Sequence, residues 1–133
     1  LLAVEMFVTK DGEVLVNEVA PRPHNSGHQS IEANVTSQYE QHLRAIFNLP
    51  LGACNTLLPS AMVNLLGEDG YEGLARYEGF DKIAQISGVH VHLYGKQITK
   101  PYRKMGHVTI VDSDIERLKE KTLIVKQTLK VIA

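Results

Sequence analysis

Two glutamates on either side of a predicted turn are the residues of this sequence best suited to hold a metal ion. Glu5 lies in one apolar, β-rich run and Glu18 lies in the next, and Asp11-Gly12 stands between the runs. An Asp-Gly pair in this setting is typical of a β-hairpin with a two-residue type I′ turn. Counting outward from such a turn places Glu5 directly opposite Glu18, on the same face of the hairpin.

The same register pairs Lys10 with Glu13 and Phe7 with Val16. Two carboxylates that face each other in a sheet repel, and on a half-buried face both lose hydration. A divalent cation would compensate for both effects, and carboxylate oxygens suit Mg²⁺, which completes its shell with water and phosphate oxygens. The alternative is an edge hairpin with both glutamates in water, and the hairpin alone does not decide between the two.

Polar residues that suit an anion follow Glu18 directly. They are Arg22, His24, Asn25, Ser26 and His28. The arginine offers a planar fork of donors to a carboxylate-like anion such as bicarbonate, and Gly27 lets the backbone approach a ligand. The two histidines have the spacing of a helical zinc pair, but Pro23 and Gly27 disfavour a helix there. The alternative is a polar loop tied by its own hydrogen bonds; we favour an anion site because loops often carry function.

Four cations, Lys96, Lys100, Arg103 and Lys104, lie in one predicted strand–loop–strand connection that contains no acidic residue. Such a cluster suits a phosphate ester, and a solvated basic loop is the alternative. His90 and His92 share one face of the preceding strand and could share a metal. We favour the simpler interpretation, in which they form the polar face of a half-buried strand.

Periodicity and turn residues predict the elements that position these side chains. Ser37 and Glu40 form a capping box for a helix that ends at residues 48–52. A final helix is predicted after residue 112, with Ser113 and Glu116 as its capping box. Strands are predicted at 61–66, 89–94 and 104–111, the last two as partners, and a short helix at 71–77. The inner stripe of the final helix is predicted to be Ile115, Leu118, Thr122, Val125 and Leu129.

The composition is that of an ordinary globular α+β protein. The chain has 133 residues, 44% hydrophobic and 22% charged, and a formal net charge of −1, which argues against a nucleic-acid or membrane partner. Cys54 is the only cysteine, so no internal disulfide forms, which fits the cytoplasm. The first residues look like the middle of a strand and no initiator Met is present, so we expect a piece of a longer protein.

Several segments resemble, in one order, the N5-carboxyaminoimidazole ribonucleotide synthetase family, whose members are also called ATPase subunits of phosphoribosylaminoimidazole carboxylase. The family belongs to the ATP-grasp superfamily. The resemblance covers nearly the whole chain and identifies it as the C-terminal portion. It implies that residues 1–56 are the end of an ATP-grasp antiparallel sheet with a helix, and that residues 57–133 are a small β-rich domain with a terminal helix. The segments are Glu5–Phe7, Asn17–His28, Thr36–Ala45, Leu49–Gly52 and Tyr94–Lys96 with Arg103–His107.

The resemblance implies a ligase that joins ATP, bicarbonate and 5-aminoimidazole ribonucleotide through carboxyphosphate. Mg²⁺ and ATP would be held by Glu5 and Glu18, with Asn17 as a further cofactor-binding residue. Bicarbonate or carboxyphosphate would be surrounded by the catalytic residues Arg22, His24 and Asn25, with Ser26 beside them. The ribonucleotide phosphate would be bound by Lys96, Arg103 and Lys104. The rest of the ATP-grasp domain is the implied partner, so we expect this chain to be inactive alone, and the family implies a homodimer.

Three other functions stay open from the sequence. A formate-dependent glycinamide ribonucleotide transformylase has a similar Pro-Arg-Pro-His segment, although His24 to His28 favour the carboxylating enzyme. A non-catalytic module that binds a phosphate ligand is the second alternative, and the Glu5–Glu18 pair argues against it for the parent protein. A histidine-based metal protein is the third and weakest.

Overall fold

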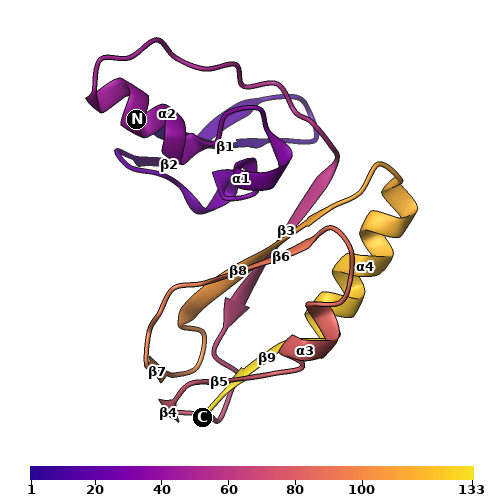
Figure 1. Ribbon diagram of the computed structural model, residues 1–133. Coiled ribbons are helices and arrows are strands. Elements are labelled where there is room, and N and C mark those ends of the chain that lie inside the picture. The colour runs from indigo at the N-terminus through magenta and orange to yellow at the C-terminus, as the bar shows by residue number, and fades with distance from the viewer. The chain divides into compact units, whose positions relative to one another are not determined.

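The computed structural model describes all residues, 1–133, and has mixed α and β structure with antiparallel sheets only. The contacts divide the chain into two compact units, Leu1–Thr56 and Leu57–Ala133. The first unit runs from indigo to magenta in Figure 1 and the second from magenta to yellow. The predicted α+β class is confirmed. None of the helices combines the length and the apolar character needed to cross a membrane.

The first unit begins with a two-stranded hairpin whose turn differs from the predicted one. Its strands are β1 (Ala3–Val8) and β2 (Val14–Ala20). Gly12 N–H donates to the Thr9 carbonyl at 3.0 Å, and Thr9 N–H donates to the Glu13 carbonyl at 2.9 Å. Only the glycine has a positive φ, 84°, whereas a type I′ turn requires two such residues. The loop therefore has three residues, and the predicted two-residue turn with its Lys10–Glu13 pair is wrong.

A β-bulge at Asn17 restores the register that the longer turn displaces. Phe7 faces Leu15, so the predicted partner of Phe7 is wrong by one residue. Beyond the bulge, Glu5 faces Glu18 as predicted. A bulge places two consecutive residues of one strand against a single partner, so Asn17 and Glu18 both lie against Glu5.

Short helical segments follow the hairpin. They are the 3₁₀ turn η1 (Asn25–Gly27), α1 (Ser30–Ala33) and α2 (Gln38–Ile46). The Ser37 hydroxyl accepts from Glu40 N–H at 3.1 Å and caps α2, which confirms the predicted helix start. The helix ends before Asn48, which takes a left-handed conformation with φ 52°.

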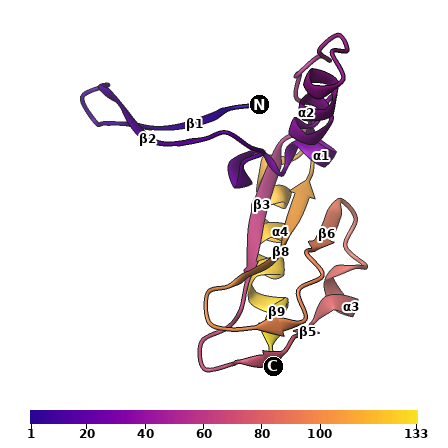
Figure 2. The same ribbon diagram turned by 90° about the vertical axis from the view of Figure 1, so that its left-hand side faces the viewer.

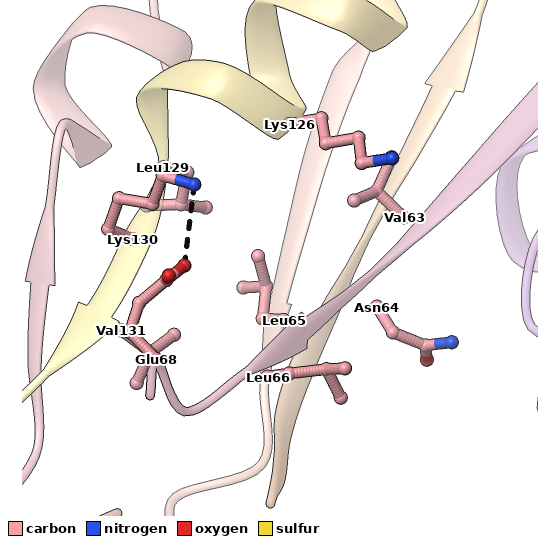
Figure 3. A pocket seen from close by; sticks show the side chains of 9 residues that line it. All are labelled: Val63, Asn64, Leu65, Leu66, Glu68, Lys126, Leu129, Lys130 and Val131. Carbon is pink, nitrogen blue, oxygen red and sulfur yellow. Dashed lines mark ion pairs between the residues drawn. The ribbon is translucent and has the colours of Figure 1, made fainter. Parts of the chain in front are cut away.

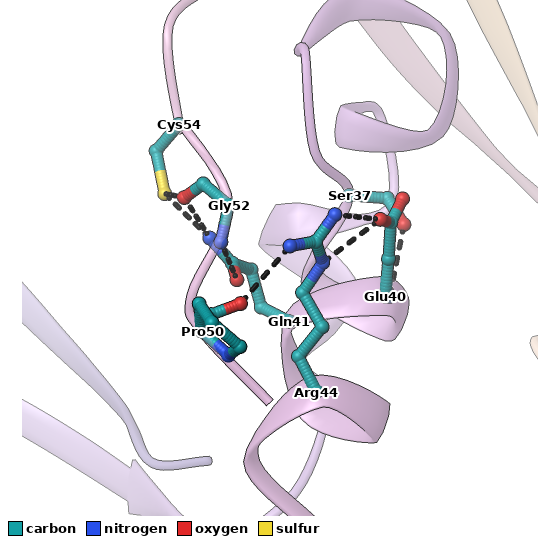
Figure 4. A network of polar contacts seen from close by, with 7 residues as sticks. All are labelled: Ser37, Glu40, Gln41, Arg44, Pro50, Gly52 and Cys54. Carbon is teal, nitrogen blue, oxygen red and sulfur yellow. Dashed lines mark hydrogen bonds and ion pairs between the residues drawn. The ribbon is translucent and has the colours of Figure 1, made fainter. Parts of the chain in front are cut away.

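Side chains of α2 fasten the segment that follows it (Figure 4). The Gln41 amide accepts from Gly52 N–H at 2.9 Å and donates to the Gly52 carbonyl at 2.6 Å. Arg44 forms an ion pair with Glu40 and donates to the Pro50 carbonyl at 2.9 Å. A Cβ at Gly52 would overlap the side chain of Thr36. Only glycine therefore allows this segment to lie so close to the chain beside it.

The second unit contains a three-stranded antiparallel sheet in the order β3-β8-β6. The strands are β3 (Ser60–Leu66), β8 (Lys104–Val111) and β6 (Val89–Leu93), which confirms the three predicted strands and the pairing of the last two. The helix α4 (Ile115–Thr128) packs against β3 and β8, and Figures 1 and 2 both show it along the sheet. The most deeply buried core side chains are Ile83, Met105, Val108, Ile110 and Val125.

The predicted short helix at 71–77 is wrong. The segment forms β4 (Gly73–Leu74) and β5 (Arg76–Glu78), and the helix α3 comes later, at Phe80–Ile83. These short strands pair with the distant strands β7 (Ile98–Thr99) and β9 (Lys130–Ile132). The partners come from far along the chain, so local sequence does not reveal them.

The start of α4 also differs from the prediction. Asp114, and not Ser113, is the N-cap, and its carboxylate accepts from Glu116 N–H at 2.9 Å and Arg117 N–H at 3.0 Å. An Asp caps as well as a Ser, so the shift by one residue costs little. Ile115 was predicted to face inward, but it is 48% exposed, whereas Leu118, Val125 and Leu129 are buried as predicted.

Candidate functional site

Two further side chains contact the acidic pair of the hairpin, Glu5 and Glu18. Asn17 Nδ2 donates to Glu5 Oε1 at 2.6 Å, and His24 Nε2 lies 2.7 Å from Glu18 Oε1. One ligand atom each from Glu5, Glu18 and His24 lies within 4.8 Å of the others. The sequence predicted both carboxylates and the residue Asn17 here, but it did not predict that His24 joins them.

The contacts of His24 define which of its ring nitrogens carries the proton. The ring is buried, with 8% of the residue exposed. An ionised carboxylate only accepts hydrogen bonds, so the short contact to Glu18 places a proton on Nε2. In the neutral ring Nδ1 is then an acceptor, and it lies 2.8 Å from the Ser26 hydroxyl, which donates to it. The bulged strand and the loop thus hold the imidazole from both sides.

The other residues of the predicted anion loop lie around this histidine in different settings. Arg22 is exposed, and its guanidinium donates to the Pro23 carbonyl at 3.1 Å. Asn25 is half-buried at the start of η1. His28 lies against α2, with its Nδ1 2.7 Å from the Tyr39 hydroxyl and its ring stacked on the tyrosine. The rings of the two loop histidines therefore have different partners: Glu18 and Ser26 for His24, and Tyr39 for His28.

The predicted phosphate-binding cations belong to the second unit. Lys96 Nζ donates to the Lys104 carbonyl at 2.6 Å, and Arg103 Nη1 donates to the Ile98 carbonyl at 2.9 Å. These bonds fasten the loop between β6 and β8, with Tyr102 at a positive φ of 62°. Lys96 and Arg103 are half-buried, whereas Lys104 is exposed. The four predicted cations thus share one loop, and two of them also stabilise it.

The strand histidines have different surroundings. His92 stacks on His107 of the neighbouring strand, with ring centroids 4.5 Å apart, and the Tyr94 hydroxyl lies 3.0 Å from His107 Nδ1. His90 is exposed on the same strand. Stacking of His92 within the sheet fits the interpretation that these histidines form its polar face.

A cavity of about 180 Å³ in the second unit contains none of the predicted site residues (Figure 3). Its lining combines apolar side chains, among them Leu65 and Val131, with Lys126 and with the 3.4 Å ion pair between Lys130 and Glu68. It lies between β3, the end of α4 and β9. Sequence periodicity gave no sign of it, because its lining joins segments that are far apart in the chain.

The arrangement in the first unit is suited to binding a cation beside an anion. Glu5 and Glu18 supply convergent carboxylate oxygens, the ligands that Mg²⁺ prefers. Hydrogen bonds from Asn17 and His24 orient these carboxylates, as the outer partners of metal ligands commonly do. Arg22 and Asn25 follow within a few residues and offer donors to an anion. The donor set therefore fits a divalent cation.

Comparison with known proteins gives matches over both units. Residues 1–39 match the ATP-grasp domain, and residues 60–121 match the phosphoribosylaminoimidazole carboxylase C-terminal domain. The chain is 49% identical over 110 residues to an N5-carboxyaminoimidazole ribonucleotide synthase of Bacillus subtilis, covering 83% of this chain and 27% of that protein.

Solved structures agree with these matches. The crystal structure of N5-carboxyaminoimidazole ribonucleotide synthetase from Thermotoga maritima superposes with a TM-score of 0.94 at 59% identity, over 99% of this chain and 37% of that one. The enzyme from Aspergillus clavatus in complex with ADP and 5-aminoimidazole ribonucleotide has a TM-score of 0.81 at 32% identity, over 95% of this chain and 34% of that one. The chain spans about a quarter to two fifths of the length of these relatives, and it belongs to the N5-carboxyaminoimidazole ribonucleotide synthetase family of ATP-grasp proteins, matching its C-terminal portion.

Proposed function

We propose that the full-length protein containing this chain carboxylates 5-aminoimidazole ribonucleotide at the expense of ATP, in de novo purine biosynthesis. A bicarbonate oxygen attacks the γ-phosphorus of ATP, which gives carboxyphosphate and ADP. The amino group of the ribonucleotide then takes the carboxyl carbon, and phosphate leaves. The observation that carries this proposal is the cluster of Glu5, Glu18 and His24, beside the proposed anion-binding loop and in the segment that matches the ATP-grasp domain.

Glu5 and Glu18 are the proposed ligands of Mg²⁺. The ion would neutralise charge on the ATP phosphates while the phosphoryl group transfers. Asn17 and His24 donate to the two carboxylates and keep them aimed at one point. Because His24 Nε2 occupies one oxygen of Glu18, the other oxygen is left to face the ion.

Arg22, His24 and Asn25 are the proposed catalytic residues around bicarbonate and then carboxyphosphate. Arg22 and Asn25 are proposed to donate to the anion, with Ser26 as a further contact, whereas His24, whose ring nitrogens contact Glu18 and Ser26, is proposed to hold Glu18 in place. The exposed guanidinium of Arg22 offers two parallel donors to a planar anion. Such donors stabilise negative charge that develops during acyl and phosphoryl transfer. Asn25 adds an uncharged donor, which does not form an ion pair with the nearby carboxylates of Glu5 and Glu18.

Lys96, Arg103 and Lys104 are the proposed contacts of the ribonucleotide phosphate. They lie in one basic loop of the second unit, which we propose to be the small C-terminal domain, residues 57–133. A relative of this chain is described in complex with ADP and 5-aminoimidazole ribonucleotide, which supports ligands of this chemistry. Lysine supplies a point charge and arginine a planar fork, and both suit a phosphate.

The rest of the ATP-grasp domain is the proposed partner of residues 1–56. The hairpin is two-stranded and exposes apolar side chains on both faces, among them Phe7 (56% exposed) and Val16 (65% exposed). A lone hairpin of this kind is only marginally stable in water, so further strands or helices must cover it. We therefore expect the chain to be inactive alone. We also propose that the protein is a homodimer. We propose a cytoplasmic location as well, which fits the free thiol of Cys54.

The experiment that tests this function compares two substrate pairs on the full-length protein. We expect 5-aminoimidazole ribonucleotide with bicarbonate to stimulate release of ADP, and glycinamide ribonucleotide with formate to leave it at the basal rate. Stimulation by the second pair alone would support the transformylase alternative. Binding of both nucleotides without turnover would support the non-catalytic module.

A further inference from the structure

A single amide side chain holds both sides of the His24 backbone. Gln38 Oε1 accepts from His24 N–H at 2.9 Å, and Gln38 Nε2 donates to the His24 carbonyl at 2.8 Å. A backbone N–H can only donate, so it fixes which end of the amide is oxygen. Gln38 thus imitates the two hydrogen bonds of a paired β-strand. It is also the first residue of α2, so a helix carries it.

The loop closes around this amide from the other side. Gly27 N–H also donates to the His24 carbonyl at 3.0 Å, and a Cβ at Gly27 would lie 2.8 Å from Gln38 Oε1. The Ser30 hydroxyl accepts from Gln38 N–H at 3.0 Å and donates to the Gly27 carbonyl at 2.5 Å. Gly27 therefore leaves the space that the amide occupies, and Ser30 joins the helix start to the loop.

The same amide also contacts the ring of His28. Gln38 Nε2 lies 2.8 Å from His28 Nδ1. Because the oxygen of the amide is already assigned, Nε2 faces the His28 ring with its N–H group. The Tyr39 hydroxyl approaches the same Nδ1 at 2.7 Å. One glutamine therefore fixes the backbone of one histidine of the loop and contacts the ring of the other.

We propose that Gln38 is a positioning residue for the carboxylation reaction, an inference that rests on the proposed function. With the His24 backbone held, only its side-chain torsions remain, and the contacts to Glu18 and Ser26 fix those. The imidazole is thereby held against a proposed metal ligand. We call the two bonds between Gln38 and the His24 backbone the Gln38 clamp. A displacement of about 1 Å at such a site can cost about 10²-fold in rate, so removal of this clamp is expected to lower kcat.

The chain contains a matched control one helical turn later. Gln41 makes the same pair of bonds to the Gly52 backbone, accepting from its N–H at 2.9 Å and donating to its carbonyl at 2.6 Å (Figure 4). Both glutamines belong to α2 and both fasten a loop. Gln41 holds a segment that carries none of the proposed catalytic residues. Comparing variants of the two glutamines therefore separates a general loss of loop order from a specific loss of His24 positioning.

The test compares Gln38→Met with Gln41→Met in the full-length protein, because Met keeps the length of the side chain and removes the amide. We expect Gln38→Met to lower kcat about 10²-fold while KM for ATP changes little, as for a displaced catalytic group. We expect Gln41→Met to lower kcat less than about threefold. Both variants lose similar hydrogen bonds, so we expect their Tm values to fall by similar amounts. Equal values of kcat in the two variants would overturn the proposal.

A second variant, Gln38→Glu, is nearly isosteric. Its ionised form keeps the acceptor for His24 N–H but cannot donate to the His24 carbonyl, and its protonated form regains one donor. We expect the ratio of its kcat to that of the unmodified protein to rise as the pH falls. A ratio that is independent of pH contradicts a positioning role.

Hydrogen exchange separates failure of this inference from failure of the proposed function. If the unmodified protein shows no carboxylation, the proposed function fails, but the clamp remains testable. We expect Gln38→Met to accelerate amide exchange in a peptide spanning residues 22–28 and Gln41→Met to leave that peptide unchanged. Unchanged exchange of this peptide in Gln38→Met would overturn the clamp itself.

Discussion

Glu18→Gln separates the role of this carboxylate in folding from its proposed role in phosphoryl transfer. The side chain of Glu18 is 53% exposed, and its hydrogen-bond partner is His24 Nε2 at 2.7 Å. The glutamine carbonyl can still accept from His24 Nε2, so only the charge is lost. Exposed ion pairs contribute about 0–1 kcal/mol to stability. We therefore expect the free energy of unfolding to change by less than about 1 kcal/mol.

The effect on activity is expected to be larger than the effect on folding. Glu18 supplies half of the protein charge that faces the proposed Mg²⁺ site, and a metal ion contributes several kcal/mol to transition-state stabilisation. A loss of about 2.7 kcal/mol corresponds to a fall of about 10²-fold in kcat. The assay is release of ADP from the full-length protein with ribonucleotide and bicarbonate, alongside denaturant unfolding. Titration with Mn²⁺ reports the metal site directly.

Glu13→Gln is the control, since it removes the same charge from the exposed turn of the same hairpin. It should leave both activity and Mn²⁺ affinity unchanged. Glu18→Gln with unaltered turnover would refute the metal role of the acidic pair. A loss of activity that follows the fraction unfolded would refute it too.

Two further predictions concern the second unit. Arg103→Ala should raise KM for the ribonucleotide about tenfold or more, since a charge-assisted hydrogen bond contributes about 1.5–3 kcal/mol; an unaltered KM would remove Arg103 from the phosphate site. Hydrogen bonds from Lys121 and from Asp114 N–H, with the charge of Arg117, lower the pKa of Asp112 from 3.8 to about 2. The folded-state pKa is depressed, so this stabilisation is present above about pH 4 and is lost as the pH falls to about 2. Asp112→Asn should flatten acid unfolding curves of the full-length protein in that interval, and an unchanged curve would contradict this.

The acidic pair was predictable from the sequence, but the path to it was only partly right. The turn has one more residue than predicted, and the bulge at Asn17 adds one residue to the opposite strand. The two departures cancel at Glu5 and Glu18 but not at Phe7. A bulge depends on contacts across the sheet, such as the bond from Asn17 to Glu5, and a local turn pattern contains no information about it.

Strong local signals predicted the rest of the fold well. The cap at Ser37 and the alternating strand around His92 each depend on neighbouring residues, and both appear as expected. The prediction of a helix at 71–77 was wrong because the two short strands found there pair with residues far along the chain. The link between Gln38 and His24 spans 14 residues. A sequence shows both residue types there, but not that one amide reaches both sides of the other backbone.

The most direct test of the proposed function is the fate of bicarbonate oxygen in the full-length protein. The reaction is run with ATP, 5-aminoimidazole ribonucleotide and ¹⁸O-labelled bicarbonate, and the released phosphate is analysed by mass spectrometry. Attack of a bicarbonate oxygen on ATP leaves that oxygen on the phosphate, so we predict one ¹⁸O atom in the phosphate for each ADP formed. Phosphate that carries no label while ADP accumulates would contradict transfer through carboxyphosphate.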